Sequence, residues 1–328
     1  MSRSLPGVSQ SHLQRLFLFA AVAACGAIKK ITVVGGSGFV GSRVCKVLVE
    51  KGAEVTSLSK TGRAPQWASG EPWTRHVKWA TVDLLDADDA AIDSQMGSPA
   101  SVISCVGVVD SDAGVLRAGN GIANVNAFAS ARRAGVKRSV YISVASEVAA
   151  CQESWLPFAK DEFAAYFNGK QIAEQAAAEA VGGDATKLCI VKPTFIYGGD
   201  KFDLPLPGKF VAPRVNAAYG SGVEEVLSLE PMKALADIAP GLIKVALRPP
   251  VSVEAVATTC ANAALGELAT GDATRRAIGI LDGTAAIKAA AGEMPPTALS
   301  DALSRALDQL GDLTEKLLDF IKAKLKAK

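Results

Sequence analysis

The sequence predicts an α/β fold with a doubly wound parallel sheet, a small C-terminal substrate region and an added C-terminal amphipathic helix. Short apolar, β-branched runs recur up to Lys192 and alternate with segments of helical periodicity, which indicates a parallel sheet with crossover helices. A glycine-rich turn follows the first of these runs. The chain has 328 residues, of which 49% are hydrophobic and 21% charged, so it can bury a full core.

The charged residues are unevenly distributed, although the formal net charge is only +2. No acidic residue precedes Glu50, the body is acidic, and lysines gather from Lys316 to the end. An acidic body lacks the basic surface that phosphate contacts require, so nucleic-acid binding is not expected. The six cysteines are widely spaced, and His12 and His76 are the two histidines, so neither a disulfide framework nor a metal site is predicted.

Residues 1–28 are interpreted as an organellar leader that precedes the fold. The segment has no acidic residue, carries Arg3 and Arg15 among serines, and contains an apolar run too short to span a bilayer. A secretory signal and an N-terminal helix that stays on the protein are the alternatives. The expected location is a mitochondrion or chloroplast, on the matrix or stroma side, with membrane association as an option.

The first strand and helix enclose the motif that most directly indicates a ligand. Residues 31–34 read as a strand buried on both faces, and apolar residues at helical spacing follow Gly41. Glycines between them allow the backbone to approach phosphates, and the helix N-terminus favours an anion, as in a Rossmann fold. The predicted dinucleotide contacts in this turn are Gly35, Ser37, Gly38, Phe39, Val40 and Gly41.

The end of the second predicted strand distinguishes the two nicotinamide dinucleotides. An acidic residue there would bind the ribose 2′-hydroxyl of NAD, but the segment after Leu58 contains none. Ser59, Lys60 and Arg63 are suited to a 2′-phosphate instead, so NADP is the predicted cofactor and NAD the second choice. Further cofactor contacts are expected where the next strands end, at Asp83, Leu84, Cys105, Val106 and Gly107.

A Tyr-x-x-x-Lys spacing follows the fifth predicted strand. On a helix Tyr166 and Lys170 share a face, so the lysine ammonium would lower the pKa of the phenol and hold a ribose hydroxyl. Tyr166 is therefore the candidate general acid or base, and Lys170 is both a catalytic and a cofactor candidate. Ser143 and Ser146 are the candidates for orienting a substrate carbonyl. Gly169 is expected to weaken the helix.

Together these residues resemble the short-chain dehydrogenase/reductase superfamily, in its extended or atypical branch. The resemblance rests on the three spaced glycines, Asp83, the Tyr166/Lys170 pair and the segments 192–198 and 251–257, and it covers residues 29 to 285. The segment 192–198 is similar to the family's strand and loop after the sixth strand, which adds Pro193 to the implied cofactor contacts. The resemblance implies a nicotinamide-dependent oxidoreductase.

Within the superfamily, the segments 38–46, 57–65 and 169–174 resemble a narrower group of organellar NAD(P)-binding proteins. The group comprises plant plastid proteins and a fungal mitochondrial accessory protein of coenzyme Q biosynthesis, and a nucleotide-binding accessory subunit of respiratory complex I is a more distant relative. The resemblance implies an oxidoreductase or isomerase that acts on a small organellar metabolite such as a quinone or isoprenoid. The alternative is a non-catalytic nucleotide-binding accessory subunit of an organellar membrane complex.

The C-terminal part is expected to extend the dinucleotide-binding domain, which spans residues 29–292. Residues 195–282 would cover the substrate, as the resemblance implies. After a linker at 293–297, aliphatic residues recur at three- and four-residue steps through 298–328, which indicates an amphipathic helix. This helix is expected to pack on the body, to meet a protein partner or a second copy, or to lie on an anionic membrane.

Overall fold

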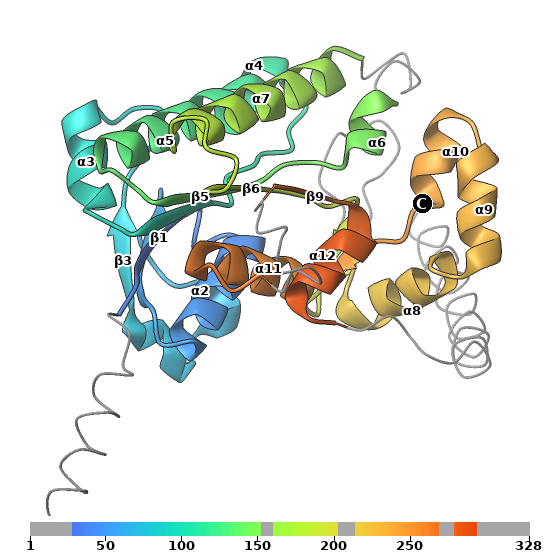
Figure 1. The fold of residues 1–328 in the computed structure, drawn as a ribbon, viewed down its shortest axis with the longest axis horizontal. Helices are drawn as coiled ribbons and strands as arrows, with labels where there is room; N and C mark the ends of the chain where they lie inside the picture. Colours follow the sequence, from blue (N-terminus) through green and yellow to red (C-terminus); the bar gives the residue numbers. More distant parts are fainter. Residues whose placement is uncertain (1–27, 152–159, 203–213, 269–278, 294–328) are drawn as a thin grey trace, which may run out of the picture.

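The computed structural model describes residues 28–151, 160–202, 214–268 and 279–293 (Figure 1). The predicted leader, apart from Ile28, and the predicted C-terminal helix lie outside the described residues, as does the linker beyond Glu293. Within the described ranges, none of the helices has the length and apolar character needed to cross a bilayer.

A seven-stranded sheet forms the centre of the molecule, in the order β3-β2-β1-β4-β5-β6-β9. Its strands are β1 (Lys30–Val34), β2 (Glu54–Ser59), β3 (Val77–Thr81), β4 (Ser101–Ser104), β5 (Arg138–Ile142), β6 (Leu188–Lys192) and β9 (Ile280–Asp282). Each neighbouring pair is parallel, which confirms the predicted fold class. The strand order reverses direction between β1 and β4, and ligands of such sheets lie at the carboxyl ends beside this switch point.

Helices cover both faces of the sheet, as a parallel sheet requires (Figure 1). One face carries α2 (Phe39–Glu50), α11 (Val253–Leu265) and α12 (Gly283–Ala291), whose buried side chains share a core with β1, β5 and β6. The other face carries α3 (Asp89–Met96), α5 (Ala123–Arg133) and α7 (Lys160–Glu179), which form a second core. Two short 3₁₀ turns, η1 (Gln66–Ala68) and η2 (Pro72–His76), connect β2 to β3.

The elements within residues 195–282, the predicted substrate-covering range, lie in different parts of the fold, and the role of this range stays a prediction. β7 (Ile196–Tyr197) and β8 (Val251–Ser252) pair in a separate two-stranded sheet. Three helices, α8 (Ala217–Leu227), α9 (Glu230–Ile238) and α10 (Gly241–Ala246), stand apart from the main layers at the right of Figure 1. By contrast, α11 is buried against α2, because it is apolar on nearly all sides and needs a core. β9 is the edge strand of the main sheet.

Candidate functional site

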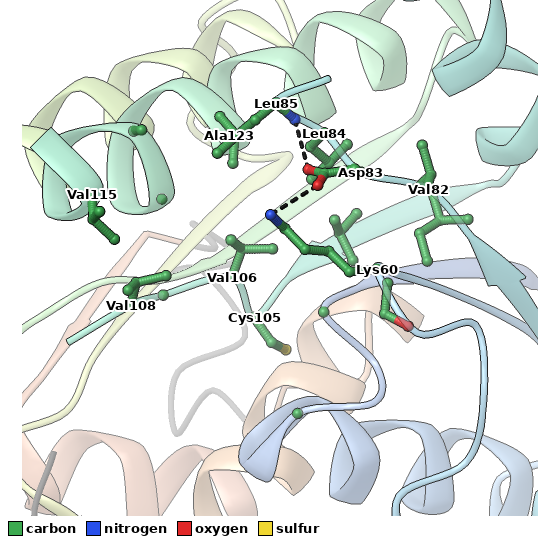
Figure 2. A pocket seen from close by; sticks show the side chains of 18 of the residues that line it. Lys60, Val82, Asp83, Leu84, Leu85, Cys105, Val106, Val108, Val115 and Ala123 are labelled. Carbon is green, nitrogen blue, oxygen red and sulfur yellow. Dashed lines mark hydrogen bonds and ion pairs between the residues drawn. The ribbon is translucent and has the colours of Figure 1, made fainter. Parts of the chain in front are cut away.

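A cavity of about 720 Å³ lies at the carboxyl ends of β1, β2, β3 and β4 (Figure 2). Its opposite wall comes from α4 (Ala113–Arg117), the π-helical segment η3 (Ala118–Ile122) and the first residue of α5. The volume lies within the range of small-molecule pockets, about 300–1,000 Å³. The cavity therefore occupies the place where the topology predicts a ligand.

Many residues that the sequence singled out for the dinucleotide meet at this cavity. Its lining includes Gly35, Gly38, Ser59, Lys60, Asp83, Leu84, Cys105, Val106 and Gly107. The remaining predicted contacts, which are Ser37, Phe39, Val40, Gly41, Arg63, Lys170 and Pro193, are not part of the lining. Ser37 lies beside it, because its hydroxyl is 2.8 Å from Ser59 Oγ and donates a 2.6 Å hydrogen bond to the carbonyl of Arg63. Their contact with a cofactor stays a prediction.

The turn after β1 needs glycine for steric reasons. Gly35 has φ +79°, and a Cβ atom there would lie 3.2 Å from the carbonyl carbon of Cys105. A Cβ atom on Gly41 would lie 2.2 Å from the carbonyl oxygen of Gly35. Because glycine has no Cβ atom, the start of α2 can lie close against the end of β1. This is the packing that the spaced glycines predict.

The N-terminus of α2 is electrostatically suited to an anion. Gly38 precedes the helix and supplies no side-chain cap, and the first turn contains no acidic residue. The N–H groups of a first turn have no acceptor within the helix and carry the positive end of its dipole. Side chains are turned elsewhere: Phe39 lies 4.7 Å from the guanidinium of Arg43, and Val40 packs on the core. Any contact of Phe39 or Val40 with phosphate would therefore be made by the backbone.

Lys60 and Asp83 form an ion pair at the edge of the cavity (Figure 2). Lys60 Nζ lies 2.9 Å from Asp83 Oδ2, and the N–H of Leu85 donates a 3.1 Å hydrogen bond to Oδ1. The hydrogen bond from Lys60 is the main cause that lowers the pKa of the Asp83 carboxyl. The sequence predicted both residues as separate cofactor contacts but did not predict their pairing.

Two asparagines that the sequence analysis missed hold the loop after β4 against the helical wall. Asn120 accepts a 3.1 Å hydrogen bond from the N–H of Val108 and donates to the Val108 carbonyl at 2.8 Å. Asn124 accepts a 2.5 Å hydrogen bond from Ser104 Oγ at the end of β4. Both amides are buried, and their four-residue spacing, which is that of one helix face, was the available signal. They position the loop that carries Gly107.

The Tyr166/Lys170 pair lies on α7, one turn apart, as predicted. Lys170 is 5% exposed and donates a 3.1 Å hydrogen bond to the carbonyl of Ile142 at the end of β5. Its Nζ lies 5.8 Å from the ring centre of Tyr166 and 5.2 Å from that of Tyr141. A Cβ atom on Gly107 would lie 3.2 Å from Lys170 Nζ, so the ammonium lies directly behind the cavity wall.

Burial shifts the pKa values of both groups away from what the sequence suggested. It raises the pKa of Tyr166 to about 12, so the expectation that Lys170 lowers the pKa of this phenol is wrong. The cause is the cost of removing a phenolate from water. Burial also lowers the pKa of Lys170 to about 8, although the charges of Cys105 and Glu174 oppose this shift. At neutral pH Tyr166 is therefore a protonated phenol, suited to donate a proton.

Gly169 lies within an unbroken helix, where it allows close packing. α7 runs continuously from Lys160 to Glu179. A Cβ atom on Gly169 would lie 3.0 Å from Cβ of Asn120 and 3.1 Å from the nitrogen of Gly121. The glycine therefore allows α7 to approach η3 closely, which brings Lys170 within reach of the cavity wall.

Neither candidate serine hydroxyl bonds to Tyr166 among the residues that the structure describes. Ser143 Oγ donates a 2.5 Å hydrogen bond to Glu174 Oε1, whose other oxygen pairs with Lys192 at 3.0 Å. Ser146 is exposed at the start of α6 (Ser146–Ala150), where its N–H donates to the carboxylate of Asp282 at 3.1 Å. Glu174 was not predicted, although it follows Lys170 by four residues on the same helix.

Comparisons with known proteins agree with this geometry. The NAD dependent epimerase/dehydratase family matches residues 31–237. An uncharacterised chloroplastic protein of Arabidopsis thaliana is 32% identical over 238 residues, which is 72% of this chain and 71% of that protein. MIOREX complex component 2 of Saccharomyces cerevisiae is 36% identical over 63 residues, which is 19% of this chain and 23% of that protein.

Two further comparisons are with a protein named as an enzyme and with a solved structure. A 3 beta-hydroxysteroid dehydrogenase/Delta 5→4-isomerase of Mycobacterium tuberculosis is 30% identical over 185 residues, so it aligns over 52% of this chain and 48% of its own length. The structure of a UDP-Glc/GlcNAc 4-epimerase from Campylobacter jejuni superposes with a TM-score of 0.50 at 14% identity, covering 73% of this chain and 74% of that one. This last likeness concerns the fold alone.

Proposed function

Because the chain belongs to the NAD-dependent epimerase/dehydratase family, we propose that it is an NADP-binding oxidoreductase or isomerase of a small apolar metabolite. The observation that carries the proposal is the position of Lys170. Its ammonium lies behind Gly107 in the wall of the cavity, and on the same helix it lies one turn from a half-buried, protonated Tyr166. Family membership supports a nicotinamide dinucleotide, and the choice of NADP is our proposal.

The residues around the cavity fit such a cofactor. The uncapped start of α2 would hold the pyrophosphate, since its glycines remove every Cβ that would block the turn. The loop after β2 carries Ser59, Lys60 and Arg63, and Arg63 is exposed. Asp83 and the apolar side chains of Val82 and Leu84 follow β3 at the same edge. This end would hold the adenosine part.

The proposed chemistry is the interconversion of a carbonyl and an alcohol. A bound nicotinamide supplies or accepts the hydride. In the direction of reduction, Tyr166 donates its phenolic proton to the substrate oxygen, which its raised pKa permits at neutral pH. Lys170 would hold the ribose hydroxyl and stabilise the tyrosinate that forms. Ser143 is engaged by Glu174, so Tyr166 alone is assigned the proton transfer.

The substrate class is proposed from the cavity and from the names of relatives. Val106, Val108 and Val115 give the helical side of the cavity an apolar lining (Figure 2). Relatives of this chain are named as a hydroxysteroid dehydrogenase and a putative dihydroflavonol reductase, which are redox enzymes of apolar ring compounds. These names support an apolar ketone or quinone as the substrate.

Turnover measurements test the proposal. The purified protein is assayed with NADPH against a panel of quinones and cyclic ketones, together with Tyr166→Phe. We expect the variant to lose at least about a hundredfold in kcat, since general acid catalysis contributes typically 10²–10⁴-fold. Tyr219→Phe is the matched control, because Tyr219 contacts Phe202 away from the cavity. Full activity of Tyr166→Phe would remove Tyr166 from the mechanism.

A non-catalytic accessory subunit is the second candidate. It is favoured by the engagement of Ser143 with Glu174, which leaves Tyr166 without a serine partner among the described residues. The name of the yeast relative, a complex component, gives further support. Native size in extracts, compared with and without residues 298–328, tests it, and an unchanged monomeric size for both forms would contradict it.

We also propose an organellar location. The acid-free segment 1–28 supports it, as does the chloroplastic relative from Arabidopsis thaliana. A fluorescent protein fused behind this segment should enter an organelle, and a cytosolic signal would contradict the proposal.

A further inference from the structure

In the ion pair between Lys60 and Asp83, the carboxylate is held more firmly than the lysine. Asp83 is fixed by two bonds, from Lys60 and from the backbone N–H of Leu85. Among the described residues Lys60 has one partner, Asp83, and 67% of its side chain is exposed. In Figure 2 the lysine stem reaches along the cavity from the end of β2 toward Asp83. The lysine can therefore move away while the carboxylate stays in place.

The loop that carries Lys60 is itself held by hydrogen bonds. Ser59 Oγ accepts a 3.1 Å bond from the N–H of Gly62 and lies 2.8 Å from Ser37 Oγ. Gly62 has φ +55°, and a Cβ atom there would lie 1.9 Å from Thr81 Oγ1. The backbone beside Lys60 is thus constrained, so a change of partner would need only rotation of the four-carbon lysine stem.

We propose that Lys60 exchanges Asp83 for the 2′-phosphate when NADP binds, so that Asp83 determines how strongly the site prefers NADP over NAD. This inference rests on the proposed function, because it assumes that the dinucleotide occupies this cavity. NAD has no 2′-phosphate and leaves the pair intact. NADP must first break the pair, and the carboxylate then lies near its phosphate and repels it. Asp83 therefore weakens NADP binding relative to NAD.

The exchange is tested by the affinities of NADPH and NADH for the full chain and its variants. Energy transfer from tryptophan to the reduced nicotinamide and titration calorimetry both report the two dissociation constants. We expect Asp83→Asn to raise the affinity for NADPH relative to that for NADH about threefold, which corresponds to the upper part of the range for an exposed ion pair. Lys60→Met should weaken NADPH binding about tenfold, because a bond to a charged group is lost.

The double variant separates competition from direct contact. In a Lys60→Met background, Asp83→Asn should strengthen NADPH binding by less than it does in the unmodified chain, because no lysine remains to be released and only the repulsion of the phosphate is relieved. Lys187 and Asp184 are the matched control: they form a 2.9 Å pair of similar exposure outside the cavity. Asp184→Asn and Lys187→Met should leave both affinities unchanged.

The results distinguish failure of the exchange from failure of the proposed function. If Asp83→Asn weakens NADPH and NADH equally, or acts equally with and without Lys60, the exchange is overturned while dinucleotide binding stands. If the unmodified chain binds neither dinucleotide, the proposed function falls and the exchange falls with it.

Discussion

Two lysine–carboxylate pairs, one at the cavity and one between α8 and α12, have opposite surroundings. Lys60 and Asp83 meet at the edge of the cavity, and most of the lysine side chain is exposed. Glu224 on α8 is 6% exposed, accepts a 2.8 Å hydrogen bond from the hydroxyl of Tyr197, and pairs with Lys288 on α12. An exposed pair contributes little to stability and can change partner, whereas breaking a buried pair leaves an uncompensated charge.

This contrast distinguishes the region around the cavity from the region in which α8, β7 and α12 pack together. At the carboxyl ends of β1 to β4, glycines and an exposed ion pair leave room for a ligand. Around α8, β7 and α12, the buried carboxylate has partners on both of its oxygens. Gly220 continues this close packing, since a Cβ atom there would lie 2.1 Å from the ring of Tyr197. Variants in the two regions should therefore affect different measurements.

The largest loss of stability is expected from Glu224→Ala. The change leaves the buried Tyr197 hydroxyl without its acceptor and removes one of the two carboxylate partners of Lys288, which keeps Glu293 at 3.3 Å, so the free energy of unfolding should fall by about 3 kcal/mol. Denaturant unfolding of the full chain measures it. Glu230→Ala is the control, since Glu230 pairs with Lys233 on the surface of α9, and it should change stability by less than about 0.5 kcal/mol. Equal effects of the two variants would contradict the contrast.

Gly41→Ala should follow, with a loss of stability of about 2 kcal/mol and of nucleotide binding. The new Cβ would collide with the carbonyl oxygen of Gly35 and push α2 away from the turn. Unfolding and NADPH titration measure the two effects. Gly52→Ala is the control, because Gly52 has φ +77° but open space around it, so only its stability should fall, by about 1 kcal/mol. Retained NADPH affinity in Gly41→Ala would refute the role of this turn.

Lys170→Met should stabilise the fold by about 2 kcal/mol at pH 7 while weakening nucleotide binding. Burial lowers the pKa of Lys170 to about 8. The charged form of Lys170 is therefore less stable in the folded state than in the unfolded state, which lowers the free energy of unfolding at pH 7. Stability of the unmodified protein should therefore rise with pH from about 8 to about 10, the unfolded state holding more protons in this range. The difference between variant and unmodified protein should narrow over the same range in denaturant titrations. A constant difference would contradict the assigned pKa.

The smallest effect is expected for Arg133→Ala on the surface of α5. Arg133 pairs with Asp93 at 2.7 Å and with Asp89 at 3.3 Å, but all three side chains are substantially exposed. The loss of stability should be below about 1 kcal/mol and should shrink in high salt. Thermal unfolding at two ionic strengths measures it, and a loss that salt does not change would indicate that the pair is more than a surface contact.

The predicted site residues that line the cavity follow from local rules. The spacing of Gly35, Gly38 and Gly41 needs only the neighbouring strand and helix, and those strand ends place Lys60 and Asp83 at one edge of the sheet. The buried amides of Asn120 and Asn124 were missed because their acceptors and donors belong to a loop whose path the sequence does not show. The places of the elements within 195–282 could not be predicted, because the burial of α11 depends on packing against α2, far away in the chain.

The sequence by itself determined the parallel sheet, the glycine turn and the helix face that carries Tyr166 and Lys170, because these depend on periodicity and on neighbours within a few residues. Only the tertiary structure decided which charges meet and how strongly each is desolvated. Lys60 forms an ion pair with Asp83, and Ser143 donates a hydrogen bond to Glu174. Burial raises the pKa of Tyr166 and lowers that of Lys170. Desolvation and pairing arise from atoms of distant segments, and no local pattern contains them.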